Sequence, residues 1–206
     1  NGLAAALAAL CLFFGQTAAA APARVLMLGD SLTAGYGLPA ADSLPSQLES
    51  LLKNQGLDVL ILNGGVSGDT TAGGLARLDW ALADNPAYAL LALGANDALR
   101  GLSPDKAYEN LDVIITRLKA KKVKVMILGM LAPLNLGRDY RESFDAIFPK
   151  LAAKHNVPLY PFLLDGVALE PKLNQRDGIH PNADGVKIIV GRLAPLVKQF
   201  LETPPG

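Results

Sequence analysis

The sequence has a single cysteine, two histidines and no excess of charge of either sign. Its 206 residues include 19 basic and 19 acidic side chains, which leaves a formal net charge of +0. A balanced charge gives no electrostatic attraction for nucleic acid or for an anionic membrane surface. One cysteine cannot form an internal disulfide or a cysteine-rich metal site. We therefore expect no nucleic-acid partner and no disulfide framework.

Charged residues are scarce, at 18% of the chain, whereas hydrophobic residues make up 50%. Disordered chains show the opposite balance, so this composition indicates a packed globular protein. The length suits one domain with a continuous core.

The first 21 residues resemble a secretory signal peptide. An apolar run extends from Leu3 to Phe14, small residues follow at Ala18–Ala21, and the first charge is Arg24. A run of about a dozen residues is too short to span a bilayer, which takes roughly twenty, but it fits the apolar core of a signal peptide and its cleavage site. The basic segment that usually precedes such a core is missing.

This leader has two alternative interpretations. It could be a helix retained in the mature protein, or Cys11 could carry a lipid, although Leu10 is large where a lipidation site prefers a small residue. We expect residues 1–21 to be removed and residues 22–206 to form a single domain. The mature protein is then periplasmic or secreted, with no stable membrane anchor.

Beyond the leader, short apolar runs alternate with helical patterns. The runs are Arg24–Gly29, Asp58–Leu62, Tyr88–Leu93, Val123–Leu128 and Val157–Phe162. Unbroken apolar runs are typical of strands that are buried on both faces, as in a parallel sheet. Apolar stripes at helical spacing lie between and after them, in 44–52, 108–118, 140–151 and 186–201, with Pro195 expected to kink the last one. The sequence predicts a three-layer α/β/α sandwich around a flavodoxin-like, five-stranded parallel sheet.

Polar residues gather in the loops that follow four of these strands, where open parallel sheets bind their ligands. The loops contain Gly29-Asp30-Ser31-Leu32, Asn63–Asp69, Gly94-Ala95-Asn96-Asp97 and Asp177-Gly178-Ile179-His180. None has the phosphate-binding P-loop, the dinucleotide-binding glycine pattern or the Gly-x-Ser-x-Gly nucleophile motif. The histidines are isolated, so a metal site is poorly supported.

A serine, a histidine and a carboxylate remain as candidates for chemistry. A serine hydroxyl needs a base within hydrogen-bond reach to become reactive. His155 precedes a strand and belongs to the amino-terminal edge of the sheet, whereas His180 shares the opposite edge with Ser31. Asp177 lies three residues before His180, close enough to orient its ring. Each feature also has a plain interpretation, as a helix cap for Ser31 or Asn96 and a simple turn for Asp177–His180.

Together, the four loop sequences resemble the four conserved blocks of the GDSL/SGNH hydrolase family, in order along the whole mature chain. Within that family the sequence is similar to bacterial acyl-CoA thioesterases, lysophospholipases and arylesterases. The resemblance implies that Ser31 is the nucleophile, His180 the base and Asp177 its orienting partner. It also implies an oxyanion hole made by the backbone N–H groups of Ser31 and Gly68 and the side-chain amide of Asn96, with no metal or cofactor.

One position departs from the family pattern, because Ala95 stands where relatives often have a second glycine before the asparagine. Its methyl group adds bulk to the loop but removes no functional group. Asp30 and Asp97, beside these catalytic positions, are expected to brace their loops.

We expect a monomer that acts on a small acyl ester or thioester. Apolar residues flank the expected site, and Leu99, Leu102, Leu134 and Leu136 are candidates for substrate binding. Such walls favour an acyl chain over a sugar, although ordinary loop packing explains them equally well. The alternatives are a carbohydrate acetylesterase of the same fold and a non-catalytic, flavodoxin-like binding module.

Overall fold

The structure is a computed structural model that describes residues 21–203. Residues 1–20, and with them nearly all of the expected signal peptide, lie outside the described residues. Among the described helices, none combines the length and the apolar character needed to cross a membrane.

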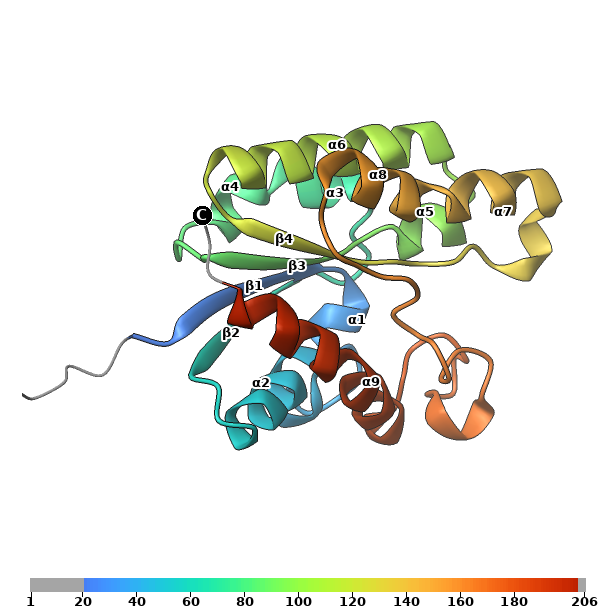
Figure 1. Ribbon diagram of the computed structural model, residues 1–206. Coiled ribbons are helices and arrows are strands. Elements are labelled where there is room, and N and C mark those ends of the chain that lie inside the picture. Colours follow the sequence, from blue (N-terminus) through green and yellow to red (C-terminus); the bar gives the residue numbers. More distant parts are fainter. Residues whose placement is uncertain (1–20, 204–206) are drawn as a thin grey trace, which may run out of the picture.

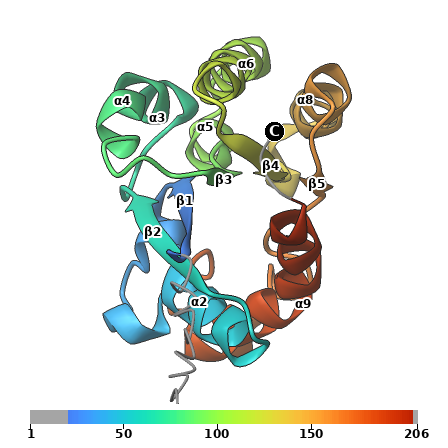
Figure 2. The ribbon, with the colours of Figure 1, turned by 60° about the vertical axis from the view of Figure 1, so that its left-hand side comes forward.

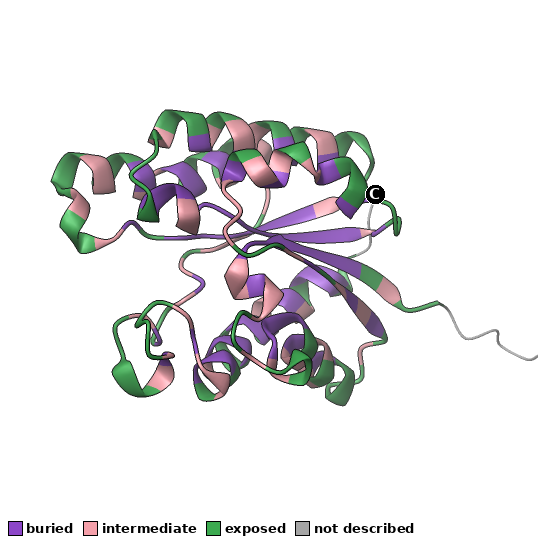
Figure 3. Cartoon of the chain, turned by 180° about the vertical axis from the view of Figure 1, so that it is seen from behind, coloured by how far each residue is buried: buried purple, intermediate pink, exposed green. Residues whose placement is uncertain are grey.

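One sheet of five parallel strands runs through the centre of the molecule in the order β2-β1-β3-β4-β5 (Figure 1). The strands are β1 (Ala23–Gly29), β2 (Val59–Gly65), β3 (Tyr88–Ala92), β4 (Lys124–Leu128) and β5 (Leu159–Tyr160). All five residues of β3 are buried, and the central strands are buried along most of their length (Figure 3). This explains why the sequence shows unbroken apolar runs there instead of alternation.

Helices cover both faces of the sheet (Figures 1 and 2). On one face lie α1 (Ser31–Ala34), α2 (Leu44–Asn54) and α9 (Ala183–Glu202). On the other face lie α3 (Thr71–Ala76), α4 (Leu78–Ala81), α5 (Ala95–Leu99), α6 (Pro104–Ala120), α7 (Arg138–Asp145) and α8 (Ile147–His155). Short 3₁₀ turns occur at Ala40–Asp42, Leu134–Leu136 and Pro171–Leu173. The predicted three-layer α/β/α sandwich with a flavodoxin-like sheet is confirmed.

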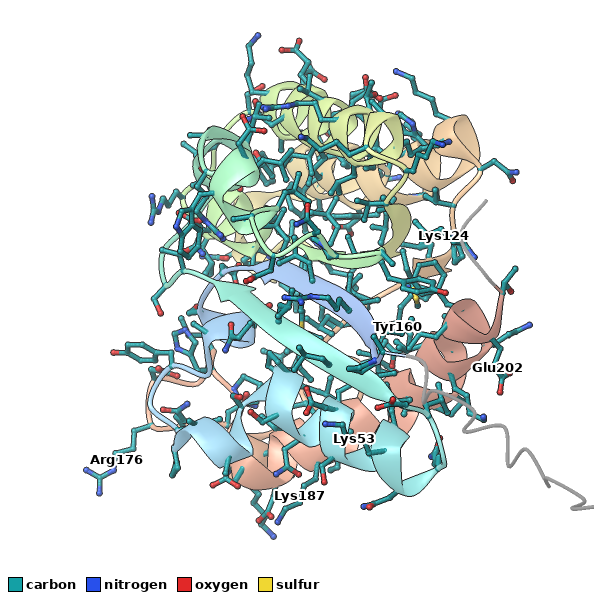
Figure 4. The ribbon with its side chains drawn as sticks, turned by 90° about the vertical axis from the view of Figure 1, so that its left-hand side faces the viewer. Lys53, Lys124, Tyr160, Arg176, Lys187 and Glu202 are labelled. Carbon is teal, nitrogen blue, oxygen red and sulfur yellow. The ribbon has the colours of Figure 1, made fainter. Side chains whose placement is uncertain are left out.

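Capping residues and apolar stripes in the sequence explain where the helices begin and which side of each packs inward. Ser103 caps α6, where its side chain accepts a hydrogen bond from the Lys106 N–H and Pro104 takes the first helical position. The apolar stripe of α9 packs inward, while exposed charged side chains such as Lys187 of α9 and Arg176 of the preceding loop point away from the body of the molecule (Figure 4). Core burial on both faces therefore fixes the sheet that carries the polar loops.

Strand β2 is longer than the sequence predicted, since the apolar run ends at Leu62. The strand continues through Asn63–Gly65, which pairs with Met27–Gly29 of β1. Gly65 has no room for a side chain, because a Cβ atom there would lie 2.2 Å from the backbone nitrogen of Ala34. The two glycines that read as a turn are therefore the place where α1 packs closely against the sheet.

Strand β5 is shorter than predicted, and the stripe in 140–151 belongs to two helices. Only Leu159–Tyr160 pairs with β4, and it is flanked by Pro158 and Pro161, which lack the N–H that would extend the ladder. Helices α7 and α8 meet at Ala146, and the stripe stays on the buried side through both. Pro195 lies inside α9, which continues beyond it to Glu202.

The strand order places the ends of β1 and β3 next to each other, with Gly29 opposite Ala92. From this point the chain crosses to β2 on one side and to β4 on the other. Such a reversal of direction opens a crevice at the carboxyl ends of the strands, where ligands of this fold class bind. The loops that start with Asp30 and Ala95 border this crevice.

Candidate active site

Ser31 is the first residue of α1, directly after the buried strand β1. Asp30 precedes it as the helix cap, and its carboxylate accepts a hydrogen bond of 3.0 Å from the Leu32 N–H. The helix ends after one turn at Gly35, whose φ of 80° terminates it in the left-handed region. This tight turn leaves Ser31 half-buried at the carboxyl edge of the sheet.

Three side chains from two distant loops form a hydrogen-bonded chain at this edge. The Nε2 atom of His180 lies 2.9 Å from the Oγ atom of Ser31. The Nδ1 atom of His180 lies 2.7 Å from Oδ2 of Asp177. The structure thus brings Ser31, His180 and Asp177 together in the order that nucleophilic catalysis requires.

The electrostatics of Asp177 fix the protonation of this chain. Its carboxylate accepts hydrogen bonds of 3.0 Å from the backbone N–H groups of His180 and Ile179 and a further bond from the His180 ring. These bonds, the backbone ones first, lower the pKa of Asp177 to about 2. An ionised carboxylate can only accept, so in the neutral imidazole of His180 the proton is on Nδ1, and Nε2 is free to accept the Ser31 hydroxyl proton.

Backbone and side-chain bonds tie the histidine loop to the serine loop. The Gln175 N–H donates to the carbonyl of His180 at 2.7 Å, and its side-chain amide donates to the carbonyl of Tyr36 at 2.7 Å. The ring of Tyr36 lies 4.6 Å from the imidazole, centroid to centroid. These contacts hold the His180 ring against the turn that presents Ser31.

Potential donors for an oxyanion lie beside Ser31. Among residues 21–203, the backbone N–H groups of Ser31 and Gly68 have no hydrogen-bond acceptor. Gly68 has a φ of +84°, a conformation that glycine adopts without strain. The side-chain amide of Asn96 donates to the Asp69 carbonyl at 3.0 Å and, over a long 3.3 Å, to Asp30. The long bond is a weak one, which leaves this N–H available to a stronger acceptor.

Asp30 and Asp97 hold the loops around these donors. Burial is the main cause that raises the pKa of Asp30 to about 6, although hydrogen bonds from Leu32 and Asn96 act in the opposite direction. Asp97 accepts bonds from the N–H (2.8 Å) and the hydroxyl (2.7 Å) of Thr71, which joins α5 to α3. Both carboxyl groups therefore bind neighbouring loop atoms, as the sequence led us to expect.

His155 lies elsewhere, at the end of α8. Its Nε2 atom is 2.6 Å from a carboxylate oxygen of Asp112, to which Lys154 also bonds. This ion-pair cluster ties α8 to α6. Within residues 21–203, no group of three or more His, Cys, Asp or Glu side chains is arranged to hold a metal ion.

A cavity of about 350 Å³ opens beside Ser31, Asn96 and His180 and is walled mainly by apolar side chains. Of the four leucines predicted to bind substrate, Leu99 and Leu134 line it, whereas Leu102 and Leu136 do not. The carbonyl of Leu102 instead accepts a bond from the Tyr140 hydroxyl, and its side chain is partly turned to solvent.

The cavity has further walls that the sequence reasoning did not identify. They come from the strand ends and loops after β4 and β5 and include Met130, Leu131, Phe162, Leu164, Leu169 and Ile179, together with Arg141 of α7. The long segment between Phe162 and His180 follows the end of β5, so the rule that such loops line the site could have pointed to its members. A second hollow of about 700 Å³ lies near the amino ends of the strands and is lined by none of the predicted site residues.

Known proteins are similar to this chain in sequence and in fold. Residues 27–188 match the GDSL-like Lipase/Acylhydrolase family. The chain is 42% identical over 180 residues to the arylesterase of Vibrio mimicus, covering 86% of this chain and 90% of that protein. It is 40% identical over 177 residues to thioesterase 1/protease 1/lysophospholipase L1 of Escherichia coli strain K12, covering 85% of this chain and 84% of that protein.

A solved structure is also similar over nearly its whole length. The crystal structure of the psychrotrophic esterase EstA from Pseudoalteromonas sp., inhibited by monoethylphosphonate, has a TM-score of 0.83 and 30% identity. The match covers 88% of this chain and 100% of that one. The chain therefore belongs to the GDSL-like lipase/acylhydrolase family.

Proposed function

We propose that the protein is a serine esterase and thioesterase that hydrolyses acyl esters and thioesters through an acyl-enzyme on Ser31. The observation that carries this proposal is the hydrogen-bonded chain from Asp177 through His180 to Ser31, which opens onto an apolar cavity. The names of its relatives, an arylesterase and a thioesterase, support the same chemistry.

The first half of the reaction forms the acyl-enzyme. The Oγ atom of Ser31 attacks the acyl carbonyl carbon while its proton passes to Nε2 of His180, and the carbonyl electron pair moves onto oxygen. When the tetrahedral intermediate collapses, the bond to the leaving oxygen or sulfur breaks. His180 gives its proton to that atom, so a neutral alcohol or thiol departs.

The second half returns the enzyme to its starting state. A water molecule gives a proton to Nε2 of His180 and attacks the acyl carbon. The second tetrahedral intermediate then expels the Ser31 oxygen, which recovers the proton from His180, and the carboxylic acid leaves.

The other site residues stabilise the charges that develop during the reaction. Asp177 holds the ring tautomer and stabilises the imidazolium that forms in each half-reaction. The N–H groups of Ser31 and Gly68 and the amide of Asn96 donate to the oxyanion of both tetrahedral intermediates. Donors fixed in place before the reaction starts stabilise this charge without reorganisation, which is why such groups contribute strongly to rate.

The shape and chemistry of the cavity support acyl chains as substrates. Its volume of about 350 Å³ is near the lower end of the range of small-molecule pockets, roughly 300–1,000 Å³. Leu99, Leu134 and Leu164 give it apolar walls that a hydrocarbon chain covers favourably. We therefore expect medium-chain acyl groups to be hydrolysed faster than acetylated sugars.

A substrate panel tests the proposal. It compares p-nitrophenyl acetate, p-nitrophenyl octanoate, octanoyl-CoA and acetylated xylan, with Ser31→Ala as the blank for each. We expect octanoyl esters and thioesters to have the highest kcat/KM and the variant to lose turnover of all four. A preference for xylan would contradict the acyl-chain assignment, and turnover that survives in the variant would contradict the role of Ser31.

We also propose that the protein is exported to the periplasm or beyond. The support is the apolar run Leu3–Phe14 followed by small residues at Ala18–Ala21. N-terminal sequencing of the protein from fractionated cells tests this, with a start near residue 22 in the exported fraction as the expected result. A chain recovered only from the cytoplasm with its leader intact would contradict it.

A further inference from the structure

One charged side chain lines the catalytic cavity and has no role in the chemistry above. Arg141 of α7 shares the wall with Ser31, Asn96 and His180. Apart from His180, it is the only ionisable side chain among the described lining residues, and no carboxylate lines the cavity. The catalytic cavity therefore contains a permanent positive charge with no anion facing it.

The guanidinium of Arg141 is unpartnered. Within residues 21–203 it forms neither a salt bridge nor a hydrogen bond, and its Nε–H is buried without an acceptor. Arg138 lies one turn earlier on the same helix and shows the ordinary arrangement: its side chain is 85% exposed and bonds Glu142 at 2.6 Å. A buried donor without an acceptor is costly, so a ligand that supplies an acceptor at Arg141 gains what the protein leaves unsatisfied.

A carboxylate at helical ion-pair spacing from Arg141 bonds a backbone N–H instead. Asp145 lies four residues later on α7, a spacing at which ion pairs form on helices. Its Oδ1 atom instead accepts the Ala132 N–H at 2.8 Å, which fastens α7 to the loop that forms one cavity wall.

Helix α7 is also held in place through Tyr140. The Tyr140 hydroxyl donates to the Leu102 carbonyl at 2.8 Å, and the Tyr140 ring stacks on that of the fully buried Phe144. These contacts fix the helix, so the position of Arg141 at the cavity wall is built into the fold.

We propose that Arg141 forms an anion subsite of this cavity, and that the preferred substrates are acyl esters or thioesters that carry a carboxylate or phosphate group away from the scissile bond. This inference rests on the proposed esterase function. A guanidinium binds either anion through two parallel N–H donors, and the surrounding apolar walls strengthen the attraction by lowering the local dielectric constant. The apolar surface then holds the hydrocarbon part of the substrate while Arg141 selects for its charge.

Two matched pairs of substrates test the subsite. In the first pair the charge is on the leaving group: 4-carboxyphenyl octanoate against its neutral amide, 4-carbamoylphenyl octanoate. In the second pair the charge is at the far end of the acyl chain: p-nitrophenyl hydrogen suberate against its methyl ester. The variants are Arg141→Gln, Arg141→Lys and, as a matched control on the same helix, Arg138→Gln.

We expect Arg141→Gln to lower the anionic-to-neutral ratio of kcat/KM about tenfold (about 1.4 kcal/mol) for at least one pair, mainly through KM. Arg141→Lys should keep part of the selectivity because it keeps the charge, and Arg138→Gln should keep the wild-type ratio. The pair that responds identifies whether the anion belongs to the leaving group or to the acyl chain. Ratios that change less than about twofold in both pairs for Arg141→Gln overturn the proposal.

If Arg141→Gln does not fold, a measurement on the wild-type protein tests the anion subsite instead. Raising the ionic strength from about 0.01 M to about 1 M shortens the Debye length from about 30 Å to about 3 Å. We expect this to lower kcat/KM for the anionic substrate more than for its neutral partner; an equal response in both overturns the proposal. Failure of the esterase function itself looks different, because the wild type would then not hydrolyse the neutral esters, or their turnover would persist in Ser31→Ala.

Discussion

Replacing Asp30 with asparagine removes a completely buried carboxyl group directly before Ser31 in the chain. The side chain has an exposed fraction of 0% and accepts hydrogen bonds from the Leu32 N–H and from Asn96. Burial outweighs those bonds and raises its pKa from 3.8 to about 6. The folded protein therefore binds a proton at Asp30 more tightly than the unfolded chain does.

That difference makes the stability of the wild type depend on pH. The pKa rises from 3.8 in the unfolded chain to about 6 in the folded protein, and at 1.36 kcal/mol for each unit the shift corresponds to about 3 kcal/mol. Because the folded-state pKa is the higher one, this stabilisation is fully present below pH 3.8 and is lost as the pH rises through 6. Asp30→Asn has no such group, so its stability should not show this loss.

Urea unfolding of both proteins between pH 4 and pH 7 measures the effect. Far-UV circular dichroism is the suitable probe, since the single tryptophan, Trp80, is 71% exposed and reports poorly on the core. The unfolding free energy of the wild type minus that of Asp30→Asn should fall by about 2.4 kcal/mol over this range, because the stabilisation is not yet complete at pH 4. Any constant effect of the substitution cancels in this comparison. A difference that stays constant with pH would refute the assignment of a buried, proton-binding carboxyl group to Asp30.

Three further predictions concern the site and the packing beneath it. Asn96→Ala should lower kcat for ester hydrolysis by about a hundredfold to a thousandfold in steady-state assays, because one oxyanion donor is lost. Asp177→Asn should lower kcat by about 10⁴-fold, because an amide facing Nδ1 of His180 favours the wrong ring tautomer; near-normal turnover would exclude that role. Gly65→Ala should lower the unfolding free energy by about 1–3 kcal/mol in urea titrations, since its Cβ atom would collide with the backbone of Ala34. An unchanged urea midpoint for this variant would show that α1 can shift away from the sheet.

The strands with continuous apolar sequences were predicted close to their true bounds, because burial on both faces leaves a pattern in the sequence itself. β1, β3 and β4 agree with the apolar runs to within a residue at each end. The end of β2 was missed because Gly64–Gly65 is typical of a turn, and only the close approach of α1 explains these glycines as strand residues. Local sequence does not encode that approach, which depends on a helix from another part of the chain.

The grouping of Ser31, Asn96 and His180 at one edge was predictable for a similar reason. The loops that contain Ser31, Asn96 and His180 follow strand ends or lead into the last helix, and a parallel sheet collects such loops at one edge. Arg141 gave no such signal, because an arginine on a helix of mixed charge reads as part of a solvated face. Its position on the cavity wall depends on how α7 is bound to the loops beside it, through Tyr140 and Asp145.

Covalent labelling with a fluorophosphonate probe tests the central claim most directly. The probe phosphonylates a serine only where a neighbouring base activates it, and the related esterase EstA was crystallised with a monoethylphosphonate inhibitor. Peptide mass spectrometry of the wild type should locate one adduct per chain, on Ser31, and Ser31→Ala should show none. An adduct on another serine, or equal labelling of the variant, would contradict the assignment of Ser31 as the nucleophile.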